Sequence, residues 1–122
     1  VFAARTPAAG YEPWVTDGTP EGTMMLRDIR PGAADGIVSF SAADPTFVVF
    51  NGEAFFVATD GVNGEEVWRT NGTPAGTRML ADLAPGAASL FAPRFAVVDN
   101  RLVIFQHAIG GTVTMHVLEV GP

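Results

Sequence analysis

The chain contains no cysteine, which excludes disulfide bonds, thiolate metal sites and cysteine nucleophiles. Lysine is absent as well: all seven basic residues are arginines, against 13 acidic residues, and the formal net charge is −6. An acidic chain without a basic patch argues against binding to nucleic acid or to anionic membranes. No apolar run reaches membrane-spanning length, and residues 1–10 lack the basic start and long apolar core of a signal peptide.

Apolar residues and turn formers are plentiful instead. The 122 residues are 48% hydrophobic and 16% charged, a balance too apolar for disorder and sufficient for one domain with a core. The 14 glycines and nine prolines indicate many turns, and no stretch carries apolar residues at helical spacing. We therefore predict an all-β fold.

An internal repeat organises the sequence. Residues 14–34 (WVTDGTPEGTMMLRDIRPGAA) return without a gap as residues 68–88 (WRTNGTPAGTRMLADLAPGAA), and 14 of these 21 positions are identical. The offset is 68 − 14 = 54 residues, and residues 1–4 align with residues 55–58 at the same offset. Identity of this extent indicates a repeat protein whose units pack on their neighbours.

Turns divide each unit into short strands. The strongest hairpin signal is Asn51-Gly52, which lies between two apolar runs. The predicted strands are residues 11–16, 23–29, 47–50, 54–59, 65–70, 77–83, 102–107 and 112–120.

The last unit departs from the other two, because the tryptophan and the Asp-Gly-Thr turn are missing. Residues 97–100 match residues 48–51 at an offset of 49. A two-residue turn at Gly110-Gly111 would place His107 and His116 diagonally on one face of a hairpin. Two ligands are too few for a specific transition-metal site, so ordinary packed or exposed histidines are the favoured interpretation.

Apolar runs such as FVVF, AFFVA and LVIF do not alternate with polar residues, which indicates strands covered on both faces. Stacked four-stranded sheets, as in the blades of a β-propeller, meet this requirement. The predicted fold class is all-β, with four-stranded antiparallel blade repeats in a partial β-propeller. Its parts are an incomplete first blade without an inner strand at residues 1–34, a complete four-stranded blade at 35–88 and a degenerate terminal blade at 89–122.

The repeated block resembles the bacterial ELWxxDGT repeat, in which a Glu-Leu-Trp strand leads into an Asp-Gly-Thr turn. Residues 12–19 read EPWVTDGT and residues 66–73 read EVWRTNGT. Pro13 and Val67 replace the leucine, and Asn71 replaces the second aspartate. The resemblance implies β-propeller-type repeats in a large secreted or cell-surface bacterial protein, and it implies no common catalytic activity.

The polar residues of the turns admit two interpretations. Their side chains could cap nearby backbone N–H groups, or they could bind calcium, which needs six to eight oxygen ligands. We favour capping because the carboxylates are sparse, and we expect no cofactor and no metal ligand. The structural turn residues are Asp17, Gly18, Thr19, Asn71, Gly72, Thr73, Asp28 and Asp82.

Trp14 and Trp68 recur at one position of the repeat, which favours packing between neighbouring units. The alternative is stacking on a ligand such as a sugar, and the two tryptophans are therefore the candidate ligand-binding residues.

No catalytic constellation can be assembled from the sequence. The three serines lie outside any Gly-x-Ser-x-Gly elbow, and no pair of glutamates stands out as a glycosidase pair. The sequence predicts a non-catalytic scaffold that binds a protein or a glycan. The alternatives are a segment of a glycan-active propeller enzyme and a purely structural spacer.

Three units are too few for a ring, because propellers close with about four to eight blades. We expect further blades from a longer parent chain or from a homo-oligomer, and neither nucleic-acid binding nor membrane insertion.

Overall fold

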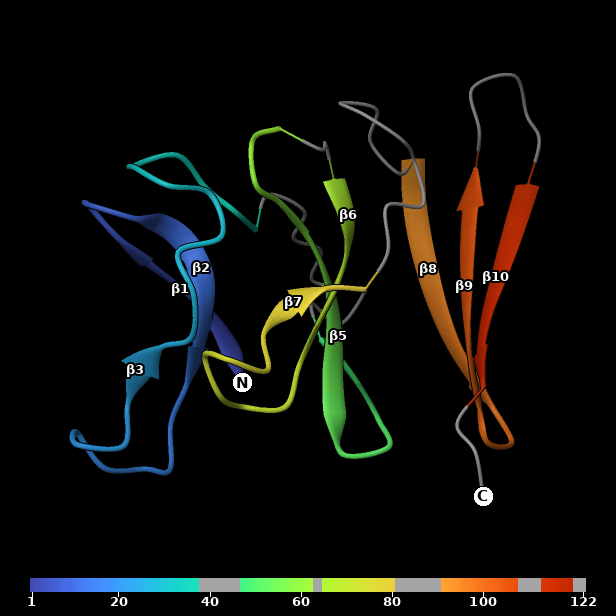
Figure 1. Cartoon of the computed structure of the whole chain (residues 1–122), viewed down its shortest axis with the longest axis horizontal. Coiled ribbons are helices and arrows are strands. Elements are labelled where there is room, and N and C mark those ends of the chain that lie inside the picture. Colours follow the sequence, from blue (N-terminus) through green and yellow to red (C-terminus); the bar gives the residue numbers. More distant parts are fainter. Residues whose placement is uncertain (38–46, 63–64, 81–90, 108–112, 120–122) are drawn as a thin grey trace.

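Three antiparallel β-sheets follow one another in chain order in the computed structural model of the protein (Figure 1). The structure describes residues 1–37, 47–62, 65–80, 91–107 and 113–119. Every regular element within these ranges is a strand, which confirms the all-β prediction. The same ranges hold no helix that could cross a membrane.

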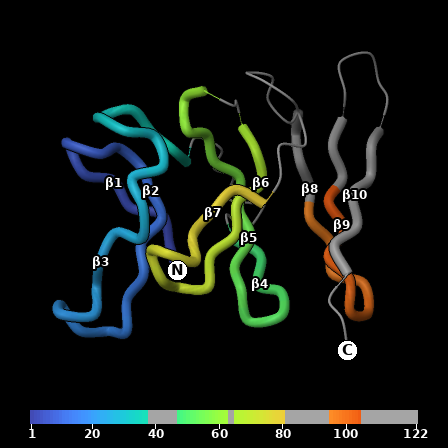
Figure 2. Tube along the Cα trace, viewed as in Figure 1, coloured from blue at the N-terminus to red at the C-terminus, as the bar shows by residue number. Residues whose placement is uncertain are grey.

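The sheets contain three, four and three strands. The first sheet has the order β1 (Phe2–Thr6), β2 (Gly10–Val15) and β3 (Met24–Met25). The second has the order β4 (Val48–Phe50), β5 (Glu53–Thr59), β6 (Glu65–Thr70) and β7 (Arg78–Met79), with β4 labelled in Figure 2. The third has the order β10 (Val113–Glu119), β9 (Arg101–His107) and β8 (Phe91–Val98).

The strand register reproduces the 54-residue offset of the sequence. Phe2 stands opposite Trp14 in the first sheet, and Phe56 stands opposite Trp68 in the second. Because successive side chains of a strand point to opposite faces, equivalent residues of the two sheets belong to equivalent faces. The repeat is therefore a structural repeat for these two sheets.

Two-residue hairpins join the first two strands of the second sheet and of the third. Asn51-Gly52 connects β4 to β5 with φ angles of 53° and 76°, the left-handed conformation of a tight hairpin, and this confirms the predicted turn. Asp99, with a φ of 52°, begins the equivalent loop between β8 and β9. The hairpins are related by an offset of 99 − 51 = 48 residues, one fewer than the sequence alignment predicts.

The pairing of β9 with β10 corrects the turn predicted at Gly110-Gly111. Val113 pairs with His107 and His116 pairs with Ile104, so residues 108–112 separate the paired ends. The backbone positions of His107 and His116 are then three residues apart along the ladder, whereas a two-residue turn places them two residues apart. The predicted diagonal pair of histidines is wrong.

The outer strands are shorter than predicted. Residues 23–29 and 77–83 were expected to be extended throughout, but β3 and β7 contain two residues each. The last three residues of the second range lie outside the described part of the chain. Beyond β3 the chain leaves the ladder because the backbone N–H groups of Ile29 and Arg30 donate to the buried side chain of Glu12.

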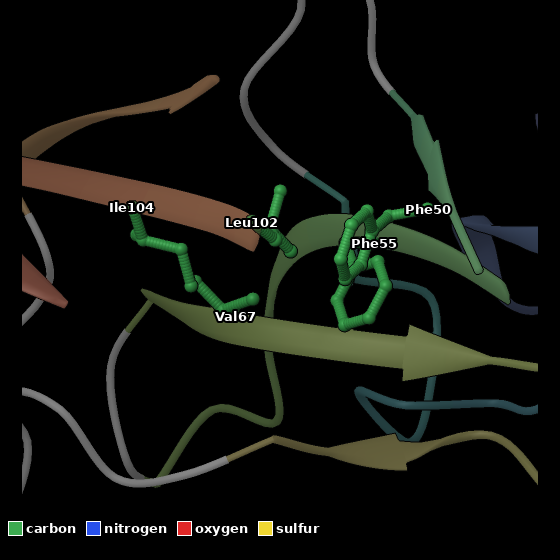
Figure 3. Packing of buried hydrophobic residues seen from close by; sticks show 5 residues of the cluster. All are labelled: Phe50, Phe55, Val67, Leu102 and Ile104. Carbon is green, nitrogen blue, oxygen red and sulfur yellow. The ribbon is translucent and has the colours of Figure 1, made fainter. Parts of the chain in front are cut away.

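Apolar clusters fill both spaces between the sheets. The cluster between the first and second sheets contains Ile29, Ile37, Phe56, Ala58 and Trp68. The cluster between the second and third sheets contains Phe50, Phe55, Val67, Leu102 and Ile104 (Figure 3). Both faces of the second sheet are covered, as the uninterrupted apolar runs predict.

Candidate functional site

Matching turns follow the two tryptophan strands. The backbone N–H and the hydroxyl of Thr19 donate to Oδ1 of Asp17 at 2.9 and 2.6 Å. The same groups of Thr73 donate to Oδ1 of Asn71 at 3.0 and 2.6 Å. An amide oxygen replaces a carboxylate oxygen without changing the turn, because each has to accept the same two hydrogen bonds.

Glycines give these turns their shape. Gly18 and Gly72 have φ angles of 93° and 91°, a conformation that residues with a side chain rarely adopt. A Cβ atom on Gly22 would collide with the carboxylate of Asp17, and one on Gly76 would collide with the amide group of Asn71. Both turns therefore need a glycine at two places.

A pair of threonine hydroxyls closes each turn at its base. The hydroxyls of Thr16 and Thr23 lie 2.6 Å apart, and those of Thr70 and Thr77 lie 2.7 Å apart. The first pair is partly open to solvent, whereas Thr70 and Thr77 are each 1% exposed. The same bond is thus found at the edge of the molecule and in its interior.

The predicted turn aspartates differ in their surroundings. Hydrogen bonds from the side chain and the backbone of Thr19 lower the pKa of Asp17, whose oxygen is already committed to the turn. Asp28 is exposed and interacts with Glu12, while Asp82 lies outside the described residues. Within the described ranges, no three His, Cys, Asp or Glu side chains gather into a group that could hold a metal ion.

Glu12 is the buried polar centre of the first unit. Its side chain is completely buried and accepts hydrogen bonds from the N–H of Ile29 (3.0 Å) and the N–H of Arg30 (3.2 Å). Gly36 packs so closely on the carboxylate that a Cβ atom there would collide with it. One glutamate thereby fixes the path of residues 29–37 across the sheet.

Burial raises the pKa of Glu12 to about 7, because the ionised carboxylate loses its hydration. The N–H donors of Arg30 and Ile29 favour the ionised form and oppose this rise, whereas the charge and hydrogen bond of Asp28 add to it. Glu12 therefore changes its protonation state near neutral pH.

From the sequence, Glu12 and Glu66 are considered only as part of the repeated motif and among the glutamates of a possible glycosidase pair, and their structural role is missed. Both are completely buried, and they occupy equivalent positions, since 66 − 12 = 54. The signal was available, because a glutamate that recurs at the repeat offset beside a buried tryptophan strand requires an explanation. Neither side chain is open to a substrate.

Trp68 lies in the seam between the first and second sheets and is 5% exposed. Arg27, from the segment after β3, places its Cζ atom 5.3 Å from the centroid of the indole ring. Its Nη1 donates to the carbonyl oxygen of Thr77 at 2.9 Å. A guanidinium group thus joins the two sheets through a cation–π contact and a hydrogen bond.

Trp14 has the same strand register but a different environment. Ala3 and Tyr11 of the first sheet pack on the cluster of Trp68, so the alternating positions Phe2 and Trp14 belong to the opposite face. We call Phe2, Trp14 and Met25 the outward face. All three are half-buried, and the Nε1–H of Trp14 is shielded from solvent without a hydrogen-bond acceptor among the described residues.

A small hollow of about 180 Å³ lies beside the β4–β5 hairpin and Val1. Its charged lining residue is Glu53, whose carboxylate forms an ion pair with Arg69. Ligand pockets usually enclose about 300–1,000 Å³ and contain several converging polar groups. The hollow therefore provides no evident reaction centre.

Comparisons of the chain with protein-family models, with curated proteins and with solved structures found no match.

Proposed function

We propose that the chain is a non-catalytic repeat module that acts as a protein- or glycan-binding scaffold in a secreted or cell-surface bacterial protein. The observation that carries the proposal is the seam at Trp68. The residue that best defines the repeat joins two sheets there, and it is not among the residues that line the hollow beside the β4–β5 hairpin. The repeated residues thus serve assembly, which is the role expected of a scaffold.

The proposed architecture is a β-propeller-type stack of blade-like sheets. It is supported by the shared register of the first two sheets and by the apolar clusters on both faces of the second. Further sheets of the same type would complete the ring, supplied by a longer parent chain or by a homo-oligomer. Sedimentation equilibrium distinguishes these sources, because a homo-oligomer has a multiple of the chain mass of 12.8 kDa.

A glycan array and a panel of hydrolase assays on the same preparation test the function. We expect binding to a glycan or to a defined protein without turnover. Turnover that is lost in a Glu53→Gln or Glu21→Gln variant with an unchanged unfolding midpoint would support an enzyme segment instead. Absence of any ligand would support a structural spacer.

A further inference from the structure

We infer that the outward face of the first sheet is a docking surface for a further unit of the same repeat, which places an arginine over Trp14 as Arg27 lies over Trp68. The inference rests on the proposed repeat assembly and deepens it, since it names the surface and the chemistry of its partner.

Equivalent residues of the first and second sheets differ in burial. Phe56 and Ala58 are 0% exposed, whereas Phe2 and Ala4 are half-buried. Five pairs of equivalent residues show this difference, and in each pair the residue of the first unit is more exposed than its equivalent in the second unit. These pairs are Phe2 and Phe56, Ala4 and Ala58, Trp14 and Trp68, Thr16 and Thr70, and Thr23 and Thr77.

The equivalent face of the second sheet is covered by the first unit. Ile29 and Ile37 supply apolar contact there, and Arg27 supplies the guanidinium group over Trp68. The register of strands and turns is the same in both sheets, so a translated unit meets the same shape on the first sheet. Its arginine would lie over Trp14 and donate to the carbonyl oxygen of Thr23, the equivalent of Thr77.

The indole of Trp14 lacks the cover that Trp68 has. Its Nε1–H has lost water and gained no acceptor among the described residues, an arrangement that costs free energy. Its ring is nevertheless more exposed than that of Trp68. An arginine has no acceptor for this N–H, which is already shielded within the chain, so the support for docking is the half-covered ring, whose equivalent at position 68 is buried.

The test adds a copy of residues 1–54 ahead of Val1. Val1 is the equivalent of Phe55 at the 54-residue offset, so the junction between Ala54 of the added copy and Val1 preserves the spacing of the repeat. Trp68→Phe in the original part and Trp14→Phe in the added copy leave the original Trp14 as the sole tryptophan. The reference protein is the unextended chain with Trp68→Phe. Emission wavelength and iodide quenching report whether the indole is covered.

We expect the added unit to shift the emission of Trp14 to shorter wavelength and to remove most of its iodide quenching. Arg27→Ala in the added unit should restore part of the quenching. The matched control is Arg27→Ala in the original unit, which lies over position 68 and should leave Trp14 unaffected.

Unchanged Trp14 emission in a folded extended chain would overturn the inference. An added unit that stays unfolded beside an intact original chain would also overturn it, because a complementary seam would stabilise the unit. A concentration-dependent blue shift in the unextended chain would overturn it in favour of a second copy. Ligand assays on the same proteins separate this inference from the proposed function. A covered Trp14 without any bound ligand would refute the proposed binding function and leave the docking surface intact. Ligand binding with unchanged Trp14 emission would refute the docking surface and leave the binding function intact.

Discussion

Arg27 of the first unit lies over the indole ring of Trp68 in the second, with Cζ 5.3 Å from the ring centroid. The same guanidinium group donates to the Thr77 carbonyl oxygen, so one side chain holds a strand and the start of the following outer strand together. The two residues in contact belong to different sheets and are separated by 68 − 27 = 41 positions in the sequence. A second polar link between the second sheet and the segment after β3 is the N–H of Thr59, which donates to the carbonyl oxygen of Gly36 at 2.8 Å.

Arg27→Ala should lower the free energy of unfolding by about 1 kcal/mol, because it removes a cation–π contact and a hydrogen bond from the seam. Urea unfolding followed by the tryptophan signal measures the change. Arg78→Ala is the control, since Arg78 is exposed on β7 and should change stability little. Equal effects of the two substitutions would contradict the importance of the seam.

Thr70→Val should cost about 1–2 kcal/mol more than Thr16→Val, although both remove the same hydroxyl pair. The difference arises because Thr77, the partner of Thr70, is buried. Its hydroxyl would keep its hydrogen bond to the carbonyl oxygen of Thr73, but the lone pair that faces Thr70 would lose its partner where water cannot replace it. The partner of Thr16 is open to solvent and can bind water. Parallel chemical denaturation of the two variants provides the comparison, and similar losses would count against it.

The stability of the protein should fall as the pH rises from about 4.5 to about 7. Glu12 has an ordinary pKa of 4.5 in the unfolded chain and a pKa of about 7 in the folded one, so the folded state binds more protons in this window. The stabilisation is complete below pH 4.5 and is lost as the pH passes through 7, with a full amplitude of about 3 kcal/mol.

Urea midpoints at four values between pH 4.5 and 8 measure this slope. Glu12→Gln should flatten it, because the amide does not titrate. Asp28→Asn should move the window to lower pH, since the charge and hydrogen bond of Asp28 help to raise the pKa of Glu12. A Glu12→Gln variant with the full slope of the wild-type protein would disprove the assignment.

Leu102→Ala should destabilise the protein by about 2–4 kcal/mol, because it leaves a cavity between the second and third sheets. Leu102 is 0% exposed and contacts the cluster of Phe55 and Val67 (Figure 3). Val97→Ala is the control, as Val97 is 49% exposed on β8. Calorimetry of both variants tests the expectation, and a small loss for Leu102→Ala would show that the third sheet is not part of the cooperative unit.

Local chemistry explains what could be predicted from the sequence. The Asn51-Gly52 hairpin follows from residues that adopt positive φ at low cost. The apolar run AFFVA requires cover on both faces, and Phe55 and Phe56 indeed face different neighbours. Equivalence of Trp14 and Trp68 follows from the gapless alignment, because equal spacing between paired residues produces equal register.

Distant contacts explain what could not be predicted. Residues 23–29 have the composition of a strand, and their departure from it depends on the side chain of Glu12, which belongs to another strand. The different exposure of Trp14 and Trp68 depends on their neighbours and not on their nearly identical local sequences. The register of β9 with β10, in which His107 pairs with Val113, differs from the one that a two-residue turn at Gly110-Gly111 would give.

The brevity of β3 and β7 has a consequence for behaviour at high concentration. A long bare strand at the rim of a sheet is a template on which foreign chains can extend the ladder and grow into fibrils. β3 and β7 are each two residues long, and two of the backbone N–H groups that follow β3 donate to the side chain of Glu12. The buried glutamate thus leaves little bare rim there for fibril growth.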